Sequence, residues 1–247
     1  MLSPLTVAKL LPALPLPSKA ETHIWQLPLA WVSTQADNWS LWLSRDEQDR
    51  AQRFYRSQDR TRFILCRGGL RYLLARYLGC PPDALAFAYG PHGKPSLVNP
   101  PRALHFNLAH TKEWVVYGVG HHEHLGVDVE QIVPRLHLDG LIQRCLMPEE
   151  QACLSAAPAE RLNDFFRYWT VKEAHLKAIG LGLSYPMTDV QVAWQPAPYL
   201  VRPAQTKAGS PHAWTVKLWH PTETAIAAAC VGQADSRLSI RFFPLDS

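Results

Sequence analysis

A single carboxylate inside the apolar face of a helix constrains this fold more than any other feature of the sequence. The large apolar side chains of residues 159–179 fall on one arc when they are projected at 100° per residue, which predicts an amphipathic helix. Glu173 lies within that arc, beside Trp169. A carboxylate directed at a core is unfavourable unless something neutralises its charge. The helix must therefore meet a charged partner or a cation. The arc consists of Leu162, Phe165, Phe166, Trp169, Leu176 and Ile179.

A second acidic segment offers a reason for that carboxylate. Residues 126–130 (GVDVE) alternate, so a strand over this range places Asp128 and Glu130 on one face and two valines on the other. Taken alone, such a strand is usually a solvated face. Together with Glu173 it favours a shared divalent cation, and Mg²⁺ prefers a few carboxylates plus substrate phosphates. No Cys/His set has the spacing of a zinc site.

At these residues the chain resembles the 4′-phosphopantetheinyl transferase superfamily in its long, surfactin-synthetase-activating form. That family carries G-[IV]-D-[IV]-E, present here at residues 126–130, and W-x-x-K-E-[AS]-x-x-K, present at 169–177. Two shorter motifs agree, namely G-K-P at 93–95 and F-N-x-[SA]-H-[ST] at 106–111. All four stand in the family's order, and the resemblance spans roughly residues 42–184.

The resemblance implies an α+β fold with a pseudo-two-fold repeat. Each of two similar α/β halves would be a small, mostly antiparallel sheet packed on a long helix, with the active site in the cleft between them. The chain carries a faint repeat of its own, because His110 and His220 end similar strands 110 residues apart. We therefore expect an N-terminal arm (1–22), a first α/β half (23–122) and a second α/β half (123–247).

Periodicity and turn residues predict the elements within these halves. Helices are expected over residues 44–54, 57–78, 138–145, 148–154 and 159–179. Strands are expected over 23–32, 85–89, 104–108, 114–119, 126–130, 189–194, 214–219, 225–231 and 238–243.

The reaction implied by the resemblance is attack of a carrier-protein serine on the β-phosphate of coenzyme A. Asp128, Glu130 and Glu173 would bind Mg²⁺, and Glu173 would also be the candidate base. Lys177 lies one helical turn beyond Glu173 and could reach the pyrophosphate or the serine oxygen. Glu150 is a second catalytic candidate, although an acid at a helix N-terminus is also explained by capping.

Further residues are expected at the phosphates of coenzyme A. The resemblance makes His110 a ligand of the 3′-phosphate; otherwise it is an ordinary turn histidine. Ala109 stands where many relatives have serine, so a hydroxyl contact is missing. Gly93 and Lys94, in a Pro/Gly-rich loop, could approach the adenosine phosphate, although a surface lysine is also possible. The remaining candidates for coenzyme A are Arg50, Arg56, Lys172 and Lys177, and Lys172 could instead only snorkel from the apolar arc.

Composition bounds the partners and the compartment. A net charge of +4 suits a polyphosphate ligand or an acidic helical acyl or peptidyl carrier protein, and it does not demand nucleic acid. No stretch is long and apolar enough to span a membrane. Five cysteines at loose spacing fit reduced thiols in a cytoplasmic protein. Because both halves occur in one chain, we expect a monomer.

Two rival functions remain open at this point. One is a metal-dependent nuclease that uses Asp128, Glu130 and Lys172, although the lysine is misplaced for such a site. The other is a non-catalytic module that binds coenzyme A or a carrier protein. The complete carboxylate triad argues against the second rival.

Overall fold

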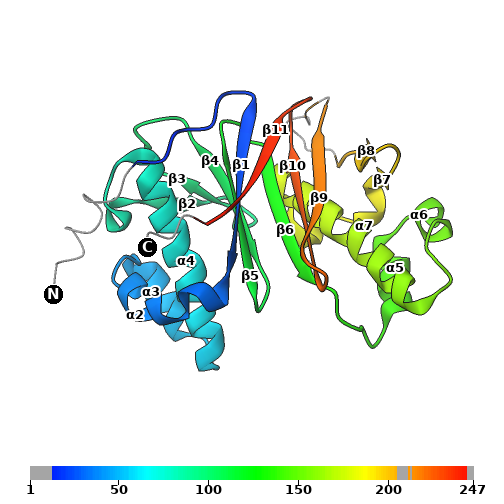
Figure 1. Ribbon diagram of the computed structural model, residues 1–247, viewed down its shortest axis with the longest axis horizontal. Coiled ribbons are helices and arrows are strands. Elements are labelled where there is room, and N and C mark those ends of the chain that lie inside the picture. The colour runs from blue at the N-terminus through cyan, green and yellow to red at the C-terminus, as the bar shows by residue number, and fades with distance from the viewer. Residues whose placement is uncertain (1–12, 205–210, 212, 244–247) are drawn as a thin grey trace.

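Two larger sheets and two long helices form the body of the α+β fold (Figure 1). The computed structural model describes residues 13–204, 211 and 213–243. The first sheet has the strand order β11-β1-β5-β4 and the second the order β6-β10-β9. The strands of the first sheet are β1 (Glu21–Pro28), β4 (His105–His110), β5 (Trp114–Gly120) and β11 (Arg237–Phe242). Those of the second are β6 (Leu125–Gln131), β9 (Thr215–Thr222) and β10 (Ala225–Val231).

Each larger sheet is covered by one of the long helices, as Figure 1 shows. Helix α4 (Ser57–Leu78) covers the first sheet and α7 (Pro158–Ile179) the second, and each has 22 residues. Both helices end at a glycine with positive φ, Gly79 and Gly180, a conformation that glycine adopts without steric penalty. The two long helices predicted over residues 57–78 and 159–179 are thus confirmed to within a residue. A two-fold relation between the halves stays a prediction.

Shorter elements connect these layers. α3 opens with a capping box, in which the Ser44 amide donates to the Glu47 carboxylate at 3.0 Å. The short helices are η1 (Leu29–Gln35), α2 (Ala36–Ser40), α3 (Arg45–Gln52), η2 (Pro82–Ala84), α5 (Leu138–Cys145), α6 (Pro148–Ala152), η3 (Gly182–Ser184) and η4 (Met187–Asp189). Two small hairpins pair β2 (Phe87–Tyr89) with β3 (Pro95–Leu97) and β7 (Gln191–Ala193) with β8 (Tyr199–Arg202).

The two larger sheets share an apolar core that fixes which face of β6 meets α7. Leu125, Val127 and Val129 of β6 are buried in that shared core. Alternation along the strand then turns Asp128 and Glu130 toward α7. The predicted two-faced strand is therefore present, with its acidic face directed at the helix.

The last strand crosses back to the first sheet, which departs from the division at residues 122 and 123. β11 pairs in parallel with β1, and the buried Phe243 packs in the core beneath α4. The predicted second half (123–247) therefore contributes a strand to the first sheet. Of the predicted N-terminal arm, residues 1–12 lie outside the described residues. Within the described part of the arm, the Leu14 amide donates to the Arg76 carbonyl at 3.0 Å.

Candidate active site

A glycine on β6 brings the strand and α7 into direct backbone contact. A Cβ on Gly126 would lie 2.0 Å from the Ala174 carbonyl oxygen and 2.4 Å from the Ala178 amide nitrogen. No side chain fits in that space, so this position requires glycine. The close approach places Glu173 and Lys177 of α7 beside Asp128 of β6. The first residue of the GVDVE motif is thus a packing requirement for the site.

Three carboxylates meet one lysine at this contact. Lys177 Nζ donates to Asp128 Oδ1 at 2.6 Å. Asp128 is 4% exposed and Glu173 is 6% exposed. Asp128 Oδ2 and Glu173 Oε1 are buried and have no hydrogen-bond partner. Unpaired buried carboxylate oxygens are unfavourable, so this cluster has spare capacity for a cation or a proton.

Glu130 belongs to the same cluster but has partners of its own. Its Oε1 accepts from the Trp169 indole nitrogen at 2.9 Å, and Arg135 lies 3.7 Å from its Oε2. Burial and the nearby Asp128 charge raise the pKa of Glu130, although the Trp169 hydrogen bond opposes that shift. The carboxylate that the sequence places in the apolar arc therefore has two acidic neighbours.

Mutual repulsion and burial control protonation in the cluster. Burial, followed by the Asp128 charge, raises the pKa of Glu173 from 4.5 to about 7. Burial alone would lower the pKa of Lys177, but Asp128 reverses this effect and the pKa is raised. One ammonium thus faces three carboxylates, which leaves an excess of negative charge.

The carboxylate oxygens of Asp128, Glu130 and Glu173 are of the type that Mg²⁺ prefers, although the three side chains do not converge on a single metal position. Across the described part of the chain, no group of three His, Cys, Asp or Glu side chains is spaced so that it could hold a metal ion. Lys177 donates to Asp128 and Trp169 donates to Glu130, so each of these two carboxylates already has a partner. The two unpaired carboxylate oxygens and the excess negative charge are what a hard divalent cation would satisfy.

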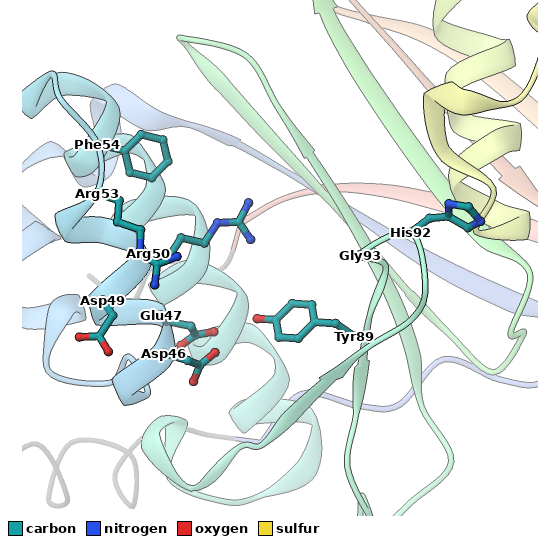
Figure 2. Close-up of a pocket in the computed structure, with 9 residues that line it drawn as sticks. All are labelled: Asp46, Glu47, Asp49, Arg50, Arg53, Phe54, Tyr89, His92 and Gly93. Atoms are coloured by element: carbon teal, nitrogen blue, oxygen red, sulfur yellow. The ribbon is translucent and has the colours of Figure 1, made fainter.

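A cavity of about 300 Å³ opens beside Glu173 and Lys177 and is lined from both halves of the chain. It adjoins a larger cavity of about 870 Å³, because His92 and Gly93 line both. Gly93, at φ +80°, lies in the turn between β2 and β3. In Figure 2, Arg50 of α3 and Tyr89 of β2 point toward one another across the larger cavity, with His92 beside the second half. The two cavities form a groove from Arg50 to the carboxylates.

His110 ends β4 near this groove and has a cationic neighbour that sequence reasoning missed. Partial burial, followed by the Arg62 charge, lowers the pKa of His110, and Lys177 also contributes. Arg62 lies on α4 and forms an ion pair with Asp59. His110, Arg62 and Lys177 therefore form a basic neighbourhood. Arg62 belongs to none of the four motifs, so its position near His110 could be recognised only from the tertiary structure.

Lys172 and Glu150 are a correction to the sequence-based site. Both are buried, and the hydrogen-bond partners of Lys172 lie outside the carboxylate cluster. Lys172 Nζ donates to Glu150 Oε2 at 2.5 Å and to the carbonyls of Cys145 and Met187 at 2.8 and 3.1 Å. Glu150 also accepts from the Met147 and Val192 amides, both at 2.8 Å. Every donor of the ammonium is used, so this pair stabilises the fold and has no capacity for a phosphate.

Of the other residues predicted to contact phosphate, some line the groove and some do not. Arg50 lines the larger cavity, whereas Arg56 is exposed at the start of α4 and lines neither cavity of the groove. Ala109 is buried in the core between the sheets. Lys94 lines the smaller cavity, but its ammonium is engaged by three backbone carbonyls.

Two family descriptions match consecutive parts of the chain. The 4′-phosphopantetheinyl transferase superfamily matches residues 124–231, and the N-terminal domain of 4′-phosphopantetheinyl transferase matches residues 30–121. The boundary between the matches lies between β5 and β6, where the chain passes from the first sheet to the second.

Individual proteins agree with these matches. The 4′-phosphopantetheinyl transferase HetI of Nostoc sp. is 35% identical over 214 residues, which cover 85% of this chain and 87% of that protein. The 4′-phosphopantetheinyl transferase Sfp of Bacillus subtilis is 28% identical over 61% of this chain and 66% of its own length. The holo-[acyl-carrier-protein] synthase of Thermotoga maritima overlaps 43% of this chain and 61% of its own, at 25% identity and a TM-score of 0.36.

These matches cover both halves of the chain, and the HetI match extends across nearly all of it. Each of the four motifs also contributes at least one residue to the groove or to the carboxylate cluster described above. The chain therefore belongs to the 4′-phosphopantetheinyl transferase superfamily, in its long, Sfp-like form, and is an enzyme of that class.

Proposed function

We propose that this enzyme transfers 4′-phosphopantetheine from coenzyme A to a serine of an acyl or peptidyl carrier protein and releases adenosine 3′,5′-bisphosphate. One observation carries the proposal. Buried, partly unpaired carboxylates and Lys177 stand at one end of a groove whose other end holds Arg50. Such a groove can hold an extended, polyanionic ligand with its reacting phosphate at the acidic end. The rival nuclease would need Lys172 beside Asp128 and Glu130, but the Lys172 ammonium is engaged by Glu150 and by the carbonyls of Cys145 and Met187.

Residues along the groove and in the carboxylate cluster have different roles in this reaction. The serine oxygen attacks the β-phosphorus of coenzyme A, and the bridging bond to the adenosine bisphosphate breaks. Glu173 accepts the serine proton, directly or through a water. Lys177 neutralises phosphate charge once a substrate oxygen replaces Asp128 as its partner. His110 and Arg62 bind the 3′-phosphate, and Arg50 adds charge in the larger cavity.

Mg²⁺ belongs to the same proposal. Asp128, Glu130 and Glu173 would hold it. A cation there supplies charge neutralisation for the pyrophosphate, which phosphoryl transfer requires.

A basic, apolar surface beside the carboxylates supports an acidic carrier as the partner. Leu136, in the loop between β6 and α5, is 99% exposed. Arg135 and Arg161 line the surface hollow around it together with Asp139, which pairs with Arg161 at 3.2 Å, and Arg135 also contacts Glu130. An acidic helix with an apolar residue at its centre complements such a surface.

Leu136→Glu should raise KM for the carrier by roughly tenfold while KM for coenzyme A is unchanged. The matched control is Leu41→Glu, at a residue that is 60% exposed on the opposite half.

Mass spectrometry of a carrier domain incubated with the enzyme, coenzyme A and Mg²⁺ tests the proposal directly. Only a transferase adds the mass of phosphopantetheine to the carrier serine. Asp128→Ala should reduce that rate at least ~10²-fold with the fold retained, the scale of one lost electrostatic stabiliser. Glu149→Ala, an exposed acid on α6, is the matched control and should modify the carrier normally. An unmodified carrier with the wild-type enzyme, or near-normal activity of Asp128→Ala, would contradict the assignment.

A monomeric, cytoplasmic enzyme is also part of the proposal. Both halves that line the groove come from one chain, and all five cysteines are free. Within the described residues, no helix combines the length and the apolar character needed to cross a membrane. Size-exclusion chromatography with light scattering tests the oligomeric state.

A further inference from the structure

One lysine of the first half donates its side-chain hydrogen bonds to carbonyls of the second half. Lys94 follows the turn between β2 and β3. Its Nζ donates to the carbonyl of Ala178 in the last turn of α7 at 2.7 Å. It also donates to the carbonyls of Leu125 and Glu123, at the start of β6, at 3.2 and 3.3 Å. Three acceptors thus match the three protons of one ammonium.

The position of these acceptors explains why a cation stands there. The final carbonyls of a helix lack partners within the helix and carry the negative end of its dipole. Ala178 is one of these residues in α7, and Lys94 satisfies it from outside. The lysine stem also crosses the end of the helix, because its Cδ lies 3.7 Å from where a Cβ on Gly180 would be. The contact is therefore built from both charge and packing.

This contact connects the segments that form the site. Ala178 adjoins Lys177, and Leu125 opens the strand that carries Asp128 three residues later. Lys94 itself adjoins Gly93, which lines both cavities. A second hydrogen bond also connects the two halves: Asn107 Oδ1 of β4 accepts from the Val127 amide of β6 at 2.9 Å. Movement at Lys94 would shift the groove relative to the carboxylates.

We infer that Lys94 is a positioning residue, a cationic latch that holds the two halves in register across the groove, and that it is not a phosphate ligand. Its effect on turnover rests on the proposed function, whereas its effect on the ligand-free protein does not. A phosphate could bind Lys94 only if the ammonium released three carbonyls, one of which ends α7. The G-K-P motif then contributes the turn at Gly93 and the latch at Lys94.

The test compares Lys94→Met, which keeps the stem and removes the donors, with Lys94→Arg, which keeps a cation. Hydrogen exchange is measured in the absence of coenzyme A on peptides that cover residues 123–127 and 176–182. A latch predicts exchange at least about tenfold faster at both segments in Lys94→Met, together with a lower melting temperature. Lys94→Arg should recover most of the protection. Lys112→Met, at an exposed lysine in the turn between β4 and β5, is the matched control and should leave both segments unchanged.

Kinetics separate the latch from a phosphate contact and from simple stabilisation. At a temperature well below the melting transition of the variant, a latch lowers kcat at saturating coenzyme A and changes KM for coenzyme A and for 3′-dephospho-coenzyme A by the same factor. Unchanged exchange and melting in ligand-free Lys94→Met, with only KM raised, would overturn the inference. If Lys94→Met does not fold, Lys94→Gln is measured in the same way. If the wild-type enzyme proves inactive on carriers, the exchange experiment still decides the latch.

Discussion

Two clusters of buried charge lie on α7 within one turn of each other, and they differ in how completely their atoms are paired. Lys172 and Glu150 satisfy each other and four backbone groups. Glu173 and Asp128 have only Lys177 between them and leave two buried oxygens without a partner. A saturated cluster has nothing left to bind, whereas an unsaturated one must gain a proton, a cation or a substrate. The completeness of hydrogen bonding, more than burial or charge, therefore separates the structural cluster from the functional one.

The largest effect is expected from breaking the saturated cluster. Lys172→Met keeps the length of the side chain but leaves the Glu150 carboxylate buried without its counter-charge. Loss of one partner of a buried pair should lower the free energy of unfolding by about 3–5 kcal/mol. Urea denaturation measures this change. The rate per folded molecule should stay near that of the wild type, since Lys172 does not reach the groove.

The double variant Lys172→Met/Glu150→Gln is the control for that experiment. Removing both charges should recover part of the lost stability, because no uncompensated charge remains. A Lys172→Met enzyme that is as stable as the wild type but binds coenzyme A poorly would reverse our assignment of the two clusters.

The opposite pattern is expected for the unsaturated cluster. Glu173→Gln keeps the size of the side chain and removes a buried charge, so the melting temperature without metal should hold or rise. Turnover at saturating Mg²⁺ should fall ~10²-fold or more, the scale of a lost general base. Melting and kcat are measured on the same preparation. A variant that melts normally and still works at more than about a tenth of the wild-type rate would exclude the base role.

The pH dependence of stability sharpens the same contrast. The raised pKa of Glu173 means that the folded protein binds more protons than the unfolded chain between pH 4.5 and about 7. Stability of the metal-free protein should therefore fall as pH rises through that window, by a contribution on the order of 1–3 kcal/mol from this group. Thermal melts of wild type and Glu173→Gln in EDTA across pH 4.5–8 isolate that contribution. Parallel curves for the two proteins would show that Glu173 titrates normally.

The smallest effect is expected in the basic neighbourhood of His110, Arg62 and Lys177. His110→Ala should raise KM for coenzyme A by roughly tenfold, the scale of one charge-assisted hydrogen bond, and should affect 3′-dephospho-coenzyme A less. Arg62→Ala should show the same selectivity if both residues bind the 3′-phosphate. Equal losses for both ligands would assign His110 to another part of coenzyme A.

The elements were more predictable than the contacts between them. Helix α7 follows from its apolar periodicity, and the ends of both long helices follow from the glycines that stop them. The acidic face of β6 follows from alternation. The crossing of β11 back to β1 could not be predicted, because a parallel partner more than 200 residues away leaves no local signal. The same holds for Arg62, whose importance depends on where α4 meets the end of β4.

Lys172 and Glu173 show where prediction from sequence ends. The order of residues determined that a carboxylate would lie on the buried side of α7, and that Gly126 and Asp128 would share a strand. Neighbours on a helix point about 100° apart, however, so adjacent residues meet different surroundings. Only the tertiary structure decided that Lys172 meets Glu150 from α6, whereas Glu173 meets Asp128 because Gly126 lets the α7 backbone approach the strand closely. Periodicity is a local property of the chain, but the pairing of a buried charge depends on residues that are brought together from distant segments.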